Sequence, residues 1–173
     1  MTMNWKCREF KIMKFDNIED YQNNKVSSIE THHGNIITDN GLVAMWLLAM
    51  GKGGSATTVG STQMTVYPFT TTDSKIAIGS GSTAAVGSDT QLANKLDEIE
   101  ITSIDILSDP SSNKCTIKFQ AEAGTGIATG NWNEWGIYDK TDGTLFNRKV
   151  ESMGTKTATS LWRIEVAIDL IRS

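Results

Sequence analysis

The sequence has little of what a nucleic-acid-binding or membrane protein needs. Among its 173 residues, 16 Lys and Arg are interspersed with 20 Asp and Glu, which gives a formal net charge of -4. No basic stripe is available to neutralise phosphates, so nucleic acid is not an expected partner. The longest apolar run, residues 42–50, is too short to span a bilayer, and the N-terminus lacks the apolar core of a signal peptide. We expect a soluble protein made in the cytoplasm.

Cysteine and histidine are also scarce, with two residues of each. Cys7 and Cys115 lie in runs that alternate apolar and polar residues, which favours buried free thiols over a disulfide between them. His32 and His33 are neighbours, so in an extended segment their side chains point to opposite sides and cannot readily share a metal ion. The sequence has no Cys-x-x-Cys or His-Glu-x-x-His pattern and predicts no metal and no cofactor. The alternative is a metal site in a trimer, formed by one His from each subunit around the three-fold axis.

The C-terminal half contains alternating runs that predict β-strands. Residues 114–121 and 162–170 each place apolar side chains on one face, and a turn joins the first of these runs to a strand over residues 98–107. The isoleucines of that strand change phase along its length. A bulge around Thr102-Ser103 is therefore expected.

A helix is predicted over residues 42–50, with Thr38 or Asp39 as its N-cap and Gly51 at its end. Every side of this helix is apolar, and Trp46 is its largest side chain. A helix that is apolar all round is expected to be buried all round. We expect it to plug one open edge or one end of the sandwich. The alternative is that a partner covers part of it.

Residues 5–15 favour a bent edge strand with a bulge near Arg8-Glu9, and residues 16–28 are polar and indicate a linker. Together these segments, which begin near Trp5, are predicted to form an arm that reaches a neighbouring subunit.

The length indicates one domain, large enough to bury about 70% of the surface of its unfolded chain. We divide the chain into an N-terminal arm and linker over residues 1–34 and a β-sandwich domain over residues 35–173. The predicted fold is mainly β: an antiparallel β-sandwich or partly open barrel with one buried apolar helix and an extended N-terminal arm.

The most informative stretch is residues 132–148, where strand formers flank Asp142 and Gly143, a dipeptide typical of tight hairpins. We interpret Glu134 as a partly buried carboxylate that accepts backbone N–H bonds and fixes its strand. Arg148 is its expected partner across the hairpin, although the partner of Arg148 can equally lie on another chain. A catalytic role for Glu134 is the weaker alternative, because no second carboxylate lies at a defined separation from it.

Two tryptophans of this hairpin allow two interpretations. Trp132 and Trp135 either pack in the core or, with Tyr138, present flat rings to a host glycan. Core packing is the favoured interpretation for at least two of the three.

The segment Gly79-Ser80-Gly81-Ser82-Thr83-Ala84 formally matches the dinucleotide-binding fingerprint and follows a predicted strand. A phosphate cradle needs a helix that opens directly from the loop, and Val86-Gly87-Ser88 would interrupt such a helix. We therefore interpret the segment as a plain loop.

Three segments occur in an order that is typical of one group of phage proteins. They are Ile36–Leu42 before the apolar helix, Ile76–Gly81 followed by Ser88–Leu92, and the hairpin with Glu134, Gly136, Asp142, Gly143 and Leu145. Over residues 35–172 the chain resembles the N-terminal, baseplate-attaching domain of phage tail-collar fibre proteins.

The resemblance implies a non-enzymatic virion protein, made in the cytoplasm of the bacterial host, that docks on other virion proteins. It also implies a homo-oligomer, with a trimer favoured. The expected docking surfaces are main-chain edges, the arm with Trp5 and any exposed part of the helix with Trp46. A capsid decoration protein also needs a compact β domain and an arm, and is the first alternative. A carbohydrate-binding module for host recognition is the second.

Overall fold

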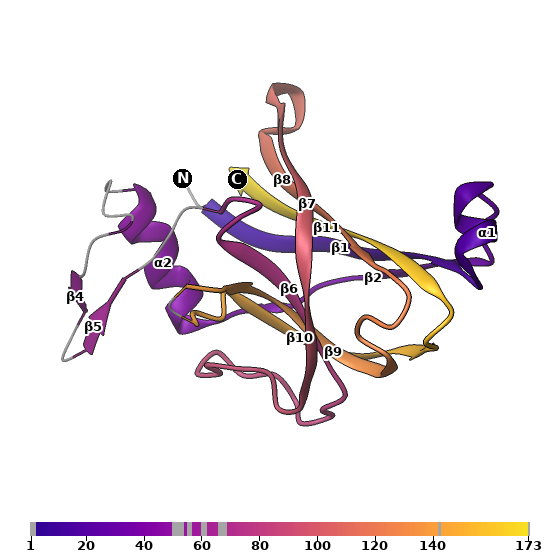
Figure 1. Cartoon of the computed structure of the whole chain (residues 1–173). Coiled ribbons are helices and arrows are strands. Elements are labelled where there is room, and N and C mark those ends of the chain that lie inside the picture. Colours follow the sequence, from indigo (N-terminus) through magenta and orange to yellow (C-terminus); the bar gives the residue numbers. More distant parts are fainter. Residues whose placement is uncertain are drawn as a thin grey trace.

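The computed structural model describes residues 3–49, 54, 57–59, 62–65, 69–141 and 143–172. These residues form a nine-stranded antiparallel sheet, a separate pair of short strands, two helices and a 3-10 turn (Figure 1). The large sheet consists of β1 (Met3–Phe15), β2 (Ser28–His32), β3 (Ile36–Ile37), β6 (Ser74–Gly79), β7 (Lys95–Asp109), β8 (Lys114–Ala123), β9 (Gly130–Asp139), β10 (Asn147–Lys156) and β11 (Leu161–Arg172). The other elements are α1 (Ile18–Gln22), α2 (Asp39–Ala49), β4 (Thr57–Val59), β5 (Thr62–Met64) and the turn η1 (Pro110–Ser112).

The large sheet curls into a partly open barrel. Its strand order is β2-β1-β11-β8-β7-β6-β9-β10-β3, so the two outermost strands, β2 and β3, are neighbours in the chain. Side chains bridge the two ends of the sheet. Lys14 Nζ on β1 donates to the carbonyl oxygen of Met153 on β10 at 2.7 Å, and His32 Nδ1 on β2 lies 3.1 Å from Glu151 Oε1. The mainly β prediction is confirmed, and the barrel is the architecture that forms.

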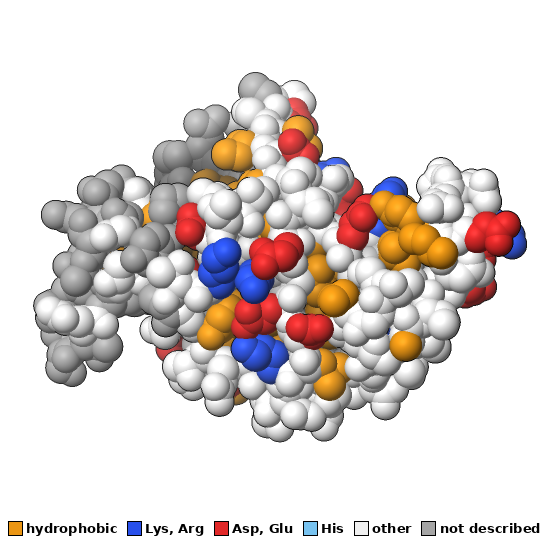
Figure 2. All heavy atoms as spheres, viewed as in Figure 1, with side chains coloured by type: hydrophobic (Ala, Val, Ile, Leu, Met, Phe, Trp, Pro, Cys, Tyr) orange, Lys and Arg blue, Asp and Glu red, His pale blue; other side chains and the backbone are white. Residues whose placement is uncertain are grey.

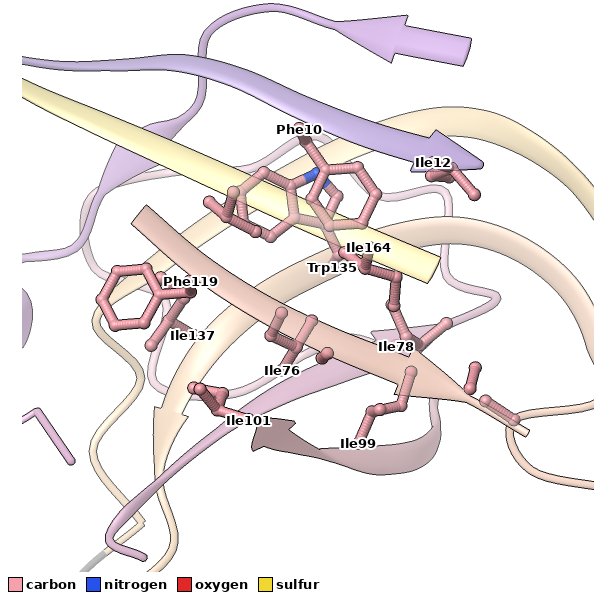
Figure 3. Close-up of a cluster of buried hydrophobic side chains, with 14 of the residues drawn as sticks. Phe10, Ile12, Ile76, Ile78, Ile99, Ile101, Phe119, Trp135, Ile137 and Ile164 are labelled. Carbon is pink, nitrogen blue, oxygen red and sulfur yellow. The ribbon is translucent and has the colours of Figure 1, made fainter. Parts of the chain in front are cut away.

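Aromatic and aliphatic side chains from opposite walls fill the barrel (Figure 3). Phe10 of β1 stacks on Trp135 of β9 with ring centroids 4.2 Å apart, although these strands are well separated in the sheet order. Trp132 and Trp162 meet edge to face at 4.7 Å. Such contacts are possible only because the sheet curls, and the apolar area that they bury stabilises the curled form.

Both bulges predicted from the sequence are present. The pairing of β1 with β11 shifts register between Cys7 and Glu9, and the pairing of β7 with β8 shifts between Ile101 and Ser103. A bulge changes which side chains face inward, and this is why apolar residues of opposite phase can share one core.

The prediction of an N-terminal arm over residues 1–34 is wrong for the described part of that segment. β1 pairs along its whole length with the C-terminal strand β11, and β2 pairs with the other edge of β1. The physical reason is burial: Phe10, Ile12 and Phe15 are each at most 1% exposed. A detached arm would return three large apolar side chains to water.

α2 is buried along one side. Ala44 and Leu47 are buried, and Met45 packs against the core at one end of the barrel, as expected of a plug. The predicted burial does not extend to the opposite side, where Leu42 is 43% exposed and Trp46 is 70% exposed. One end of a barrel covers only one side of a helix. No helix in the described part of the chain is long and apolar enough to cross a membrane.

The two cysteines lie on strands that are not neighbours. Cys115 of β8 is a free, partly buried thiol, and the side chain of Cys7 lies outside the described residues. Strand β11 runs between the two backbones, with Ile168 opposite Cys7 and Leu170 opposite Cys115. Two strand spacings amount to about 9.5 Å, whereas the Cα atoms of a disulfide lie at most about 7 Å apart. The backbone therefore disfavours a bond between them.

Replacement of Phe10 by Ala is expected to lower the free energy of unfolding by about 3–5 kcal/mol, because it removes a fully buried ring and its stack on Trp135. Urea unfolding followed by tryptophan fluorescence measures this loss. The control Ile18→Ala, on an α1 residue that is 50% exposed, should change the value by less than about 0.5 kcal/mol. A loss below about 1 kcal/mol for Phe10→Ala would contradict the role of this stack in closing the barrel.

Candidate functional site

A buried carboxylate holds the loop that joins β6 to β7, residues 80–94, against the barrel. Glu134 of β9 is 0% exposed. Its Oε1 accepts the backbone N–H of Gly81 at 3.0 Å and that of Asn94 at 2.7 Å, and its Oε2 accepts the N–H of Ala93 at 3.0 Å. The donors come from both ends of the loop. This is the role predicted for Glu134, with complete rather than partial burial.

Arg148 of β10 is the partner of Glu134 across the hairpin, as the sequence predicts. Its Nε and Nη2 donate to Glu134 Oε2 at 3.0 and 2.8 Å, and its side chain is 2% exposed. The same guanidinium donates from Nη1 to Asp89 Oδ2 at 2.7 Å and from Nη2 to the carbonyl oxygen of Thr83 at 2.9 Å. We call Glu134, Arg148 and Asp89 the charge cluster. Asp89 lies in Ser88–Leu92, one of the motifs behind the resemblance, but its contact with Arg148 was not predicted from the sequence.

The charge cluster is held in its ionised form. Burial alone would raise the pKa of Glu134, but the N–H donors of Asn94 and Ala93 and the Arg148 guanidinium outweigh it and hold this pKa below its ordinary value. Asp89 behaves in the same way: burial opposes ionisation, while the N–H of Val86 and the guanidinium lower its pKa. Burial would lower the pKa of Arg148, and its two carboxylate partners raise it instead.

The glycines of the fingerprint-like segment are explained by this carboxylate. A Cβ at Gly79 would lie 2.6 Å from Glu134 Oε1, and one at Gly81 would lie 2.8 Å from the Cβ of Ala93 and closer still to Glu134 Oε1. Both separations are too short for a real side chain. Glycine therefore lets the loop approach a protein carboxylate here, and residues 80–94 contain no helix that would open a phosphate site.

The segment before α2 joins the same framework. Thr38 Oγ1 accepts the N–H of Gly41 at 3.0 Å, which confirms Thr38 as the N-cap, and its own N–H donates to the carbonyl oxygen of Phe146 at 3.0 Å. The N–H of Asp39 donates to the carbonyl oxygen of Gly87 at 2.8 Å. The start of α2 is thus tied both to the β9–β10 hairpin and to the β6–β7 loop.

The turn of the hairpin agrees with the prediction where the structure describes it. Asp142 lies outside the described residues. Gly143 has a positive φ of 81°, and its N–H donates to the carbonyl oxygen of Asp139 at 3.0 Å. Gly136 faces the carbonyl oxygen of Asn147 so closely that a side chain would not fit. The side-chain Oδ1 of Asn147 accepts the N–H of Ile137 at 2.7 Å, a contact that strand alternation could not reveal.

The favoured interpretation of the hairpin tryptophans, packing in the core, is confirmed, and they do not form the alternative glycan platform. Trp132 and Trp135 are both 0% exposed. Trp132 Nε1 donates to the carbonyl oxygen of Ala128 at 2.6 Å, as expected of a buried indole. Neither ring is available to a sugar.

The remaining predicted site residues lie apart from the charge cluster. Trp46 lies on the exposed side of α2, and the side chain of Trp5 is outside the described residues. His32 contacts carboxylates on β2 and β10, while His33 contacts the carbonyl oxygen of Arg8. Among the described residues, no group of three or more His, Cys, Asp or Glu is placed to hold a metal ion.

The arrangement around Glu134 suits mechanical support. Its two oxygens receive five hydrogen bonds, three from backbone N–H groups and two from Arg148. A carboxylate so fully occupied in a site closed to solvent fixes its donors in place. The carboxylate thereby locks the loop that joins β6 to β7 to the β9–β10 hairpin, and the segment before α2 is joined to both through backbone hydrogen bonds to Phe146 and Gly87.

No family model matches this sequence, and no curated protein or solved structure matches it either.

The substitution Glu134→Gln is expected to lower the free energy of unfolding by about 3–5 kcal/mol, because it leaves the buried Arg148 with one counter-charge and turns an acceptor into a donor. Urea unfolding at pH 7 measures this loss. Glu100→Gln is the matched control, since the side chain of Glu100 is 64% exposed. A similar small effect for both variants would contradict the supporting role of Glu134.

The charge cluster also predicts a pH dependence. The pKa values of Glu134 and Asp89 are lowered by folding, so the unfolded chain binds more protons as the pH falls. The stability that they contribute is present above the ordinary carboxyl pKa of about 4 and is lost as the pH falls through the lowered values. We expect the free energy of unfolding to decrease below about pH 4, and less steeply in Glu134→Gln. Equal slopes for the two proteins between pH 2.5 and pH 5 would argue against this.

Proposed function

We propose that this protein is a non-enzymatic structural protein of a phage virion and that it attaches at the tail or baseplate. The observation that carries the proposal is the convergence of the motifs behind the resemblance. The β6–β7 loop and the β9–β10 hairpin bond to each other through Glu134 and Arg148, and the segment before α2 bonds to both of them. Separate short motifs are weak support for a relationship. Motifs that build one framework in a fixed order are stronger support.

The framework suggests how the protein docks. Bonds from Thr38 and Asp39 to the hairpin and the loop fix the start of α2, and Met45 holds its inner side against the core. The outer side then presents Leu42 and Trp46 to solvent. Large exposed aromatic side chains on a rigid element are typical anchors of protein interfaces. We propose that the outer side of α2 contacts a neighbouring virion protein and that the chain works as part of a homo-oligomer.

The location in the virion is tested by immunogold electron microscopy of the phage that encodes the protein, with antibodies raised against it. Label on the tail or baseplate is the expected result. Label on the head would support the alternative of a capsid decoration protein. Absence of the protein from purified virions by mass spectrometry would contradict both.

The substitution Trp46→Ser is expected to reduce incorporation into virions by at least about tenfold, because an interface anchor of this size contributes about 2 kcal/mol or more. Incorporation is measured by quantitative mass spectrometry of virions purified after complementation. The free energy of unfolding should change by less than about 0.5 kcal/mol, since the ring is exposed.

Ile18→Ser is the control for this experiment, because Ile18 is an exposed apolar residue of the other helix, α1. It should leave incorporation unchanged. Equal incorporation of Trp46→Ser and the unchanged protein would show that the outer side of α2 is not the docking surface.

A further inference from the structure

The upper half of β7 has a strand edge without a partner. β7 pairs with β6 only as far as Glu100, opposite Lys75, whereas its pairing with β8 continues from Ile101 to Asp109. Beyond Glu100, no strand of the described chain lies along the edge of β7 that faces away from β8. This part of the β7–β8 hairpin projects from the barrel (Figure 1).

The projecting edge is exposed on both faces and carries large apolar side chains. Residues 105–108 are all exposed, and among them Ile106 is 73% and Leu107 is 50% exposed. Figure 2 shows hydrophobic and acidic side chains together on this hairpin. Unpaired edges are usually protected by Lys, Pro or a covering segment. Residues 103–109, Ser-Ile-Asp-Ile-Leu-Ser-Asp, contain neither Lys nor Pro.

We propose that this edge is a self-association site, at which residues 103–109 of β7 pair antiparallel with the same residues of a second copy. A two-fold axis through Ile106 would join the two hairpins into a four-stranded ribbon, β8-β7-β7-β8. The unpaired N–H and C=O groups of a strand edge are satisfied by another extended strand, and this chain presents such a strand itself. Isologous contacts of this kind close a dimer and leave no free copy of the edge.

The sequence of the edge selects the register. Residues directly opposite each other in an antiparallel pair point to the same face of the sheet. A symmetric pair of identical strands meets this condition only if one residue lies opposite its own copy, with the two-fold axis between the two. An axis at Ile106 lies at the midpoint of 103–109 and therefore pairs the whole free edge. It places Asp105 opposite Leu107 and Ile104 opposite Ser108, so that no like charges meet.

The neighbouring registers oppose acidic residues. An axis at Asp105 sets Asp105 against its own copy, and an axis at Leu107 sets Asp105 against Asp109 twice. Like charges directly opposite each other destabilise a pair of strands. Hydrogen bonds from the Ser111 and Ser112 hydroxyls lower the pKa of Asp109 to about 2, so this carboxylate stays charged down to low pH.

The register at Ile106 also extends an existing apolar surface. Ile106 lines a cavity of about 150 Å³ between α2 and the hairpin, together with Met45, Ile117 and Leu170. The Ile106 of a second copy would lie on this same face, directly beside the first. The proposed contact has two-fold symmetry. It is separate from the proposed attachment to the virion and does not depend on it.

A pair of lysine substitutions tests the register. Ile106→Lys would place two lysines face to face at the axis, whereas Leu107→Lys would place each new lysine opposite Asp105 of the other copy. Both side chains are at least half exposed, so neither change should unfold the chain. Sedimentation equilibrium of the full chain measures the dimer dissociation constant. We expect it to rise about 10- to 30-fold for Ile106→Lys and to stay equal or fall for Leu107→Lys.

Three results would overturn the proposal. They are a wild-type chain that is monomeric at several hundred micromolar, a dimer or trimer that Ile106→Lys leaves intact, and equal weakening by both lysine variants. The last result would mean that the edge has no fixed register.

Disulfide trapping provides a second readout that does not depend on charge. In a chain with Cys7 and Cys115 replaced by Ala, Ile106→Cys should form a dimer on mild oxidation, because opposed Cα atoms lie about 4.5–5.5 Å apart in an antiparallel pair. Leu107→Cys is the matched control. Its two copies would lie about 8 Å apart, beyond the reach of a disulfide. Preferential trapping of Leu107→Cys would place the axis elsewhere and would also contradict the proposal.

Discussion

The ionised carboxylate of Glu134, closed off from water, is the constraint on which the arrangement of the β6–β7 loop and the β9–β10 hairpin depends. A charge in such a place is tolerated only if hydrogen bonds and a counter-charge replace its lost hydration. Glu134 obtains both from segments far apart in the chain: N–H groups from Gly81, Ala93 and Asn94, and the guanidinium of Arg148. The need for close approach accounts for glycine at positions 79 and 81. The result is specificity of arrangement rather than a large net gain in stability, because burial of the ion pair itself is costly.

The barrel is closed by side chains where its backbone ladder stops. Because β2 and β3 stand at opposite ends of the strand order and are consecutive in the chain, the segment between them crosses the seam. Lys14 and His32 reach across to β10 there, and the Phe10–Trp135 stack joins the walls from inside. The seam therefore depends on contacts made by side chains, whereas backbone N–H groups supply most of the bonds to Glu134.

Local features were predictable from the sequence, and contacts between distant segments were not. The two bulges, the Thr38 cap and the Glu134–Arg148 pair depend on residues within a strand, a helix end or one hairpin. Asp89 lies 59 positions from Arg148, and no periodicity points to that contact. Docking of the N-terminal strand against β11 likewise joins the two ends of the chain. Trp132 and Trp135 are three residues apart, so simple alternation puts them on opposite faces. Both nevertheless lie in the core, and the pairing of β9 with β10 is irregular between them, from Trp132 to Glu134.

The strand edges of the described sheet differ in how they are protected, and this difference bears on assembly. β3 is only two residues long, and side chains of β2 engage charged groups of β10 across the seam. Both are recognised ways of preventing unwanted pairing. The projecting half of β7 has an exposed isoleucine and leucine in place of such protection. A monomer that functions alone gains nothing from keeping that edge open, and at high concentration it risks aggregation. An open edge whose acidic residues avoid one another in a single symmetric register fits a surface kept for pairing with its own copy.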